Sequence, residues 1–159
     1  MDPVDLFIWF EDSALGTLIR ESMWLFPAIQ AIHLVGIAAL GGAILAVDLR
    51  LLNAVLRHLP PVEVLRETRL WMAGSILLMV STGVPLFLSQ AVRYYFNTSF
   101  WIKIGGLIIV VLFTYLVRNP RIRVMGNTAT TSAGLRSLAL ISISLWLVVA
   151  FAGRWVGFS

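Results

Sequence analysis

The sequence predicts an all-α integral membrane protein, a four-helix bundle preceded by an amphipathic helix at the membrane interface. Composition is the first reason: 59% of the 159 residues are hydrophobic and 13% are charged, about half the charged fraction of a soluble domain. The spacing of the charges is the second reason. No charged residue lies between Glu21 and Asp48 or between Arg69 and Arg93, and each gap exceeds the roughly 20 residues that cross a bilayer as a helix.

A single domain of residues 1–159 contains four predicted spans, at about residues 25–48, 70–91, 98–117 and 137–154. The fourth run is short, but Arg136 and Arg154 at its ends can extend to the lipid headgroups. Each run should be helical, because backbone groups in lipid must be bonded within the segment. We expect Pro60-Pro61 to break any helix in the loop of residues 53–67. We expect Asn119-Pro120 to end the third span.

Residues 4–20 are predicted to form the amphipathic helix, lying on the outer membrane surface. One side is apolar, with Phe7, Phe10, Ala14 and Leu18, whereas the segment is acidic elsewhere. Aromatic residues crowd the outer end of the third span, as in the aromatic belts of membrane proteins. They are Tyr94, Tyr95, Phe96, Phe100 and Trp101.

The charge distribution indicates a lipid partner and no nucleic-acid partner. The net charge is +4, but the basic residues sit in short segments between apolar runs, where membrane topology explains them. Eight of the twelve Lys and Arg residues follow spans one and three, at positions 50, 57, 66, 69, 118, 121, 123 and 136. The positive-inside rule then places both termini outside the cytoplasm, in a bacterial inner membrane.

The candidate cofactor site lies in the first span. Helical spacing predicts that Gln30, His33 and Gly36 share one face. An ionisable side chain within a span turns by default toward the bundle interior, and neutral imidazole is a good ligand for haem iron, copper or zinc. Gly36, one turn from His33, would leave room for a flat ligand. His33 is therefore the predicted metal ligand.

The alternative is that His33 only hydrogen-bonds to a neighbouring helix while the small residues of the span permit close packing. The spans contain no acidic partner for it, so the candidates are backbone carbonyls and neutral side chains. These side chains are Ser75, Ser81, Thr82, Tyr115, Ser142 and Ser144. Both interpretations of His33 remain open at this point.

Two further residues belong to the predicted site. Met79, at mid-span, is either the sixth ligand of a His–Met haem or core filler. Lys103 either extends outward to the interface or provides a fixed cation for a carboxylate, a propionate or a phosphate. The other histidine, His58, is expected in a loop, and the absence of cysteine excludes thiolate metal sites.

No catalytic residue is predicted, because the sequence shows no nucleophile triad, phosphate loop or paired-carboxylate site. Asp48 ends the first span, where the helix dipole disfavours a negative charge. We expect it to pair with Arg50, Arg66 or Arg69 and to be structural.

The chain resembles an uncharacterised family of bacterial four-helix membrane proteins over most of its length. The residues that carry the resemblance are Glu21-Ser22-Met23-Trp24, Pro27, His33, Gly36, Gly42, Asp48-Leu49-Arg50-Leu51-Leu52 and Asn97-Thr98-Ser99-Phe100-Trp101-Ile102-Lys103.

More distantly, the chain is similar to the copper-resistance D family, implicated in copper uptake, which also has a Lys at the start of the corresponding helix. It is also similar to the haem-binding four-helix protoporphyrinogen oxidase family. His33, Arg50 and Lys103 match that family's first-helix His, the Arg ending that helix and the Lys opening the third. The family's second functional His falls near Tyr115 here, so the resemblance implies one histidine ligand at most.

Two functional interpretations follow. The first is a small membrane protein that binds haem b or another metal cofactor for electron transfer, through His33, Gln30, Gly36, Met79 and Lys103. The second is a non-enzymatic membrane subunit or a copper or small-solute permeation protein, with His33 as a packing residue. A homo-oligomer or a membrane complex is compatible with either.

The predicted orientation can be tested with reporter fusions. A fusion after Pro61 should read cytoplasmic and fusions at either terminus should read external, because eight basic residues against four favour this topology. A cytoplasmic amino terminus would contradict the orientation and move Lys103 to the inner leaflet.

Overall fold

The computed structural model describes residues 2–126 and 131–155, and throughout these ranges the regular secondary structure is helical. Within them, the helices long and apolar enough to cross a membrane are Leu25–Leu51, Pro61–Ser89, Thr98–Met125 and Ala133–Trp155. The predicted fold class is therefore confirmed, and the chain is a multi-pass membrane protein.

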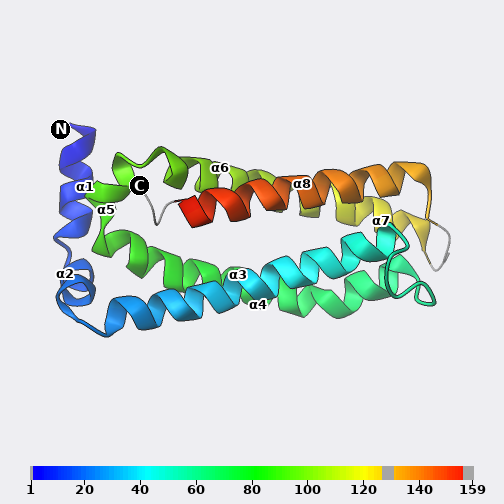
Figure 1. Ribbon diagram of the computed structural model, residues 1–159, viewed down its shortest axis with the longest axis horizontal. Coiled ribbons are helices and arrows are strands. Elements are labelled where there is room, and N and C mark those ends of the chain that lie inside the picture. The colour runs from blue at the N-terminus through cyan, green and yellow to red at the C-terminus, as the bar shows by residue number, and fades with distance from the viewer. Residues whose placement is uncertain (1, 127–130, 156–159) are drawn as a thin grey trace.

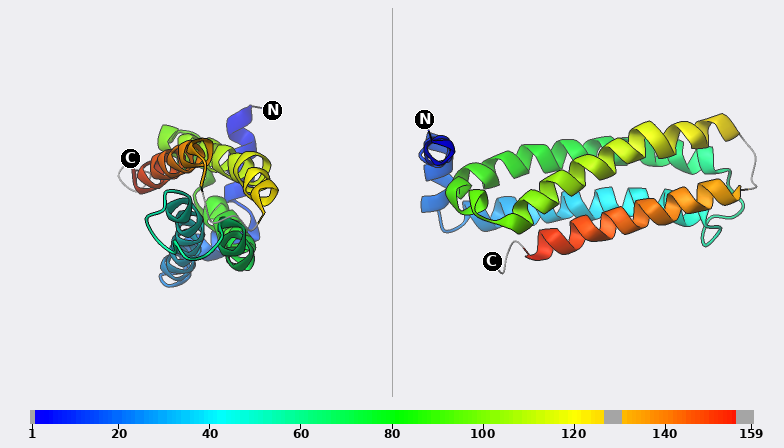
Figure 2. Two further views of the ribbon diagram at one scale, coloured as in Figure 1. Left: turned by 90° about the vertical axis from the view of Figure 1, so that its right-hand side faces the viewer. Right: turned by 90° about the horizontal axis from the view of Figure 1, so that it is seen from above.

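The four long segments run up and down as two antiparallel pairs (Figures 1 and 2). Helix α3 (Leu25–Leu51) packs chiefly against α4 (Pro61–Ser89). The third segment is built from α6 (Thr98–Leu112), the π-helix η1 (Phe113–Arg118) and α7 (Asn119–Met125). It packs chiefly against α8 (Ala133–Trp155), and contacts of α3 with α8 and of α4 with α7 join the two pairs.

Two short helices replace the single amphipathic helix that the sequence predicted over residues 4–20. Helices α1 (Pro3–Glu11) and α2 (Ala14–Glu21) lie across one end of the bundle (Figure 1). The break comes at Ser13, whose side chain accepts a hydrogen bond from the Gly16 N–H at 3.2 Å and so caps a new helix. Leu18, expected on the apolar side, is 58% exposed, whereas Ile19 is 2% exposed.

An aromatic cluster fastens α1 to the bundle. The ring of Phe7 contacts those of Phe87, Tyr95 and Trp101, with centroid separations of 5.8, 4.7 and 6.3 Å. The Glu11 carboxylate accepts a hydrogen bond from the Val92 N–H at 2.7 Å, in the first turn of α5 (Ala91–Tyr95). The predicted aromatic end of the third span is thus also the surface on which the amino-terminal helices pack.

Two proline positions behave differently from the sequence prediction. Pro61 does not prevent a helix but begins α4, because the first helical position needs no N–H donor. Asn119-Pro120 does not end the third helix, which continues to Met125. A wide turn precedes Pro120: the Asn119 N–H bonds to the Thr114 carbonyl, five residues back.

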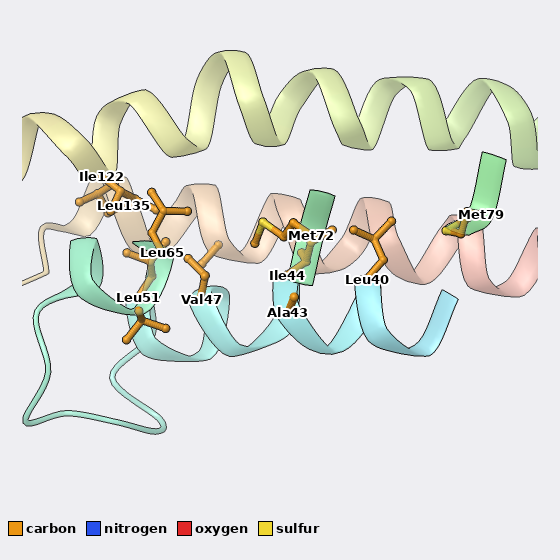
Figure 3. Close-up of a cluster of buried hydrophobic side chains, with 12 residues drawn as sticks. Leu40, Ala43, Ile44, Val47, Leu51, Leu65, Met72, Met79, Ile122 and Leu135 are labelled. Carbon is orange, nitrogen blue, oxygen red and sulfur yellow. The ribbon is translucent and has the colours of Figure 1, made fainter. Parts of the chain in front are cut away.

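The hydrophobic core fills the bundle between α3, α4, α7 and α8 (Figure 3). Its most deeply buried members lie at one end of the bundle, where Val47, Leu51 and Ile122 are 0% exposed. The cluster extends through Leu40 and Ile44 to Met79 on α4.

Glycines allow two close helix approaches in this bundle. A Cβ atom built on Gly41 would lie 2.5 Å from Nε1 of Trp146 on α8, and one on Gly106 would lie 2.9 Å from Val149. The adjacent Gly42 and Gly105 have nothing within 4 Å among the described atoms. Each Gly-Gly pair thus contributes one residue to helix packing, as small residues do in membrane interfaces.

This difference predicts opposite effects for adjacent alanine substitutions. Gly41→Ala should lower the free energy of unfolding by about 1–3 kcal/mol, because the Trp146 ring must move. Gly42→Ala should be neutral or stabilise by up to about 1 kcal/mol through helix propensity. Thermal unfolding of both variants in the same detergent would measure the difference, and equal effects would show that Gly41 is not a contact point.

Candidate functional site

Two groups of buried polar side chains link the long helices through hydrogen bonds. The first, which we call the His33 site, comprises His33 and Thr82 with the nearby Lys103. The second, the Arg118–Asp48 network, comprises these two residues with Asn119 and Ser142. His33 and Asp48 both belong to α3 and lie about 22 Å apart along it, at a rise of 1.5 Å per residue.

The His33 ring is held by a hydrogen bond that determines its tautomer. Its Nδ1 lies 2.8 Å from Oγ1 of Thr82, one of the neutral partners that the sequence suggested. The Thr82 hydroxyl donates its one proton to the Leu78 carbonyl at 2.6 Å, so Nδ1 must be the donor to Thr82. In this neutral tautomer Nε2 carries the lone pair, and the Met79 carbonyl also makes a hydrogen bond with the ring.

The helix surfaces around His33 interlock through two glycines. A Cβ atom on Gly83 of α4 would lie 3.3 Å from Cε1 of His33. A Cβ atom on Gly36 of α3 would lie 3.2 Å from Cγ of Met79. The expectation that Gly36 leaves room for a flat ligand is therefore wrong, because Met79 and Leu78 occupy that space.

The remaining predicted site residues lie in different surroundings. Gln30 is exposed and does not share the buried face of His33 and Gly36. Met79 is 6% exposed and belongs to the core cluster. Lys103 is half-buried on α6, its methylenes 3.6 Å from the Cβ position of Gly153 on α8. It acts electrostatically on His33 and makes no hydrogen bond or ion pair within residues 2–126 and 131–155.

The Arg118–Asp48 network is the residue group that the sequence prediction missed. Nη1 of Arg118 donates to Oδ1 of Asp48 at 2.7 Å, and both side chains are 0% exposed. Oδ1 of Asn119 accepts from Nε and Nη2 of Arg118, each at 3.2 Å. Ser142 of α8 contributes its hydroxyl at 3.4 Å from Nη1. Oδ2 of Asp48 has no hydrogen-bond partner in the described part of the chain.

The predicted partner of Asp48 was wrong for a local reason. Asn119-Pro120 had suggested a helix end, which placed Arg118 in a loop. The π-helix η1 instead keeps the segment helical and brings both Arg118 and Asn119 to the interior. The sequence feature that pointed to a buried ion pair was Asp48 itself, because a carboxylate at the carboxyl end of a helix requires a nearby cation.

Arg50, one of the three expected partners, holds the loop after α3. Its guanidinium donates to the Leu59 carbonyl at 2.6 Å and to Oδ1 of Asn53 at 2.7 Å. This side chain is buried, and Asn53 adopts a positive φ of 57° in the loop that it closes. Arg66 pairs with Glu63 and Glu67.

Comparison with known proteins decides the family. Residues 6–159 match the model of a family described as "Family of unknown function (DUF6644)". The chain belongs to this family. No curated protein and no solved structure matches it.

The DUF6644 match covers both buried polar groups and most of α1 as well as the four long segments. The His33 site and the Arg118–Asp48 network of this DUF6644 member are therefore both parts of the family domain. The resemblance to an uncharacterised membrane family is confirmed in this coarse form.

Removing one partner of the Arg118–Asp48 pair should be far more destabilising than removing both. Arg118→Met should lower the free energy of unfolding by about 3–5 kcal/mol, because it leaves a buried carboxylate without its counter-ion. The double variant Arg118→Met/Asp48→Leu should recover most of this loss, since no buried charge remains. Arg121→Met, an exposed neighbour, is the matched control, and an equal effect in the control would contradict the pairing.

Proposed function

We propose that this DUF6644 member binds haem b at the His33 site, with Nε2 of His33 as the protein ligand to iron. The observation that carries the proposal is the Nδ1–Thr82 hydrogen bond, which orients the ring and leaves the Nε2 lone pair for a metal. Metal-ligating histidines characteristically donate their other ring N–H in this way. Bound haem would supply one-electron chemistry, consistent with a membrane electron carrier.

The small number of metal-binding side chains favours haem over a bare metal ion. The chain has two histidines and no cysteine, and His58 is exposed in the loop after α3. No group of three or more His, Cys, Asp or Glu residues converges within the described ranges. A macrocycle that brings four nitrogen ligands of its own needs only one histidine from the protein.

Contacts around the ring limit where such a ligand would lie. The α3–α4 interface is filled at Gly36 and Gly83, so a porphyrin would not lie between these two helices there. Lys103 on α6 would pair with a propionate, because its ammonium has no described acidic partner. Gln30, which is exposed, and Met79, which is packed in the core, would not be ligands.

A second candidate function has its own supporting observation. The reciprocal contacts of His33 with Gly83 and of Met79 with Gly36 are those of a helix-packing motif. In that case His33 is a core residue of a non-enzymatic membrane subunit, and its hydrogen bond to Thr82 serves only packing. The two candidates differ in whether Nε2 binds anything.

We infer that the protein lies in a bacterial inner membrane with both termini outside the cytoplasm. Arg50 and Arg118 are buried, so they do not count as loop charges. Six basic residues then remain at the end of the bundle near the α3–α4 loop, at positions 57, 66, 69, 121, 123 and 136. Four lie toward the other end, at positions 20, 93, 103 and 154, so the positive-inside asymmetry keeps its direction.

An absorption spectrum tests the haem proposal. Protein purified from haem-supplied cells should show a Soret band that His33→Ala abolishes while the protein still unfolds cooperatively. Thr82→Val should weaken haem retention by about tenfold or more, because the ring loses its orienting acceptor. Lys103→Gln should weaken retention as well, whereas His58→Ala should leave the spectrum unchanged.

The contrary outcome is equally definite. A colourless wild type from haem-supplied cells, with His33→Gln tolerated in thermal unfolding, would exclude the cofactor and leave the packing function.

A further inference from the structure

A cavity of about 430 Å³ lies between α4 and the η1–α7 segment, away from the His33 site. Arg66, Arg69 and Glu63 of α4 face Tyr115, Asn119 and Arg123 across it. Helix α4 has 29 residues and is therefore about 43 Å long, against about 30 Å of hydrocarbon. Because the uncharged stretch of α4 starts after Arg69, we expect the first turns of α4 and this cavity to lie at headgroup depth.

The charge of the cavity is only partly neutralised. Arg66 lies 3.8 Å from Glu63 and 3.5 Å from Glu67, so its charge is compensated. Arg69 and Arg123 make no hydrogen bond or ion pair with any residue that the structure describes. Two guanidinium groups from different helices therefore border one cavity with their charge uncompensated.

The polar wall of the cavity offers further hydrogen-bond donors. Arginine can only donate, so the two bonds from Arg118 identify the Asn119 atom they reach as the carbonyl oxygen. The Asn119 amide nitrogen then keeps two N–H donors, and no described acceptor takes them. The Tyr115 hydroxyl likewise makes no hydrogen bond within the described ranges. Donors and positive charge together match a phosphate group, which only accepts.

We propose that this cavity binds a phosphate group, with Arg69 and Arg123 providing the charge and Asn119 a neutral donor. Basic cavities between membrane helices at headgroup depth suit anionic lipid headgroups. Leu65 and Met72, which also line the cavity, provide apolar surface on which a lipid chain would begin. A soluble phosphate compound shares the same recognition chemistry, and the experiment separates the two sources.

The test uses full-length protein, delipidated in neutral detergent, and the double variant Arg69→Gln/Arg123→Gln. The matched control is Arg121→Gln/Arg136→Gln, which removes the same charge from exposed positions that do not line the cavity. The probes are phosphatidylglycerol and phosphatidylcholine in mixed micelles, and inorganic phosphate alone. Native mass spectrometry measures retained lipid, and the thermal unfolding midpoint reports the binding of each probe.

If the phosphate belongs to a lipid, phosphatidylglycerol should bind the wild type and the control about thirtyfold more tightly than the cavity variant. That factor follows from about fivefold for each arginine near an anionic headgroup. If it belongs to a soluble compound, inorganic phosphate alone should raise the unfolding midpoint of the wild type and control but not of the cavity variant. Equal behaviour of the cavity variant and the control with every probe would overturn the proposal.

Discussion

The buried ion pair between Arg118 and Asp48 is the interaction on which the arrangement of the bundle depends. It joins α3 to the third segment, and Ser142 adds α8 to the same group. Two charges at zero exposure among apolar helices are tolerable only while they remain together, because their mutual attraction offsets the several kcal/mol of solvation that each ion loses on burial. The helices must therefore meet in one register. The π-helix is part of this requirement, since it turns Arg118 and Asn119 inward together just before Pro120.

The polar residues divide the molecule into two ends with different properties. One end holds the Arg118–Asp48 network, the Arg50-bound loop and the arginine-lined cavity. The other holds the His33 site, Lys103 and the aromatic contacts that fasten α1. Along α3, the core residues Leu40, Ala43 and Ile44 lie between His33 and Asp48. A ligand at either end would thus be recognised by different residues, although α4 contributes to both sites, and packed hydrophobic side chains would separate the two ligands.

Near His33 the same contacts serve packing and ligand orientation. Thr82 satisfies Nδ1, and Gly83 lets the ring approach α4 closely. A ring held in this way loses little entropy when Nε2 binds a ligand, yet it is also a stable core residue without one. These contacts are therefore common to a cofactor site and to a packing motif.

The sequence by itself determined the class of protein, the four spanning segments, the burial of His33 and its hydroxyl partner among a few candidates. These follow from local requirements: lipid demands long uncharged helices, and a titratable ring within them must face the interior. Only the tertiary structure decided that Asp48 pairs with Arg118, that Met79 fills the space beside Gly36 and that Gln30 is exposed. Those outcomes depend on helix register and on one wide turn before Pro120. Neither can be read from spacing along the chain, because Arg118 and Asp48 meet only after the helices have packed.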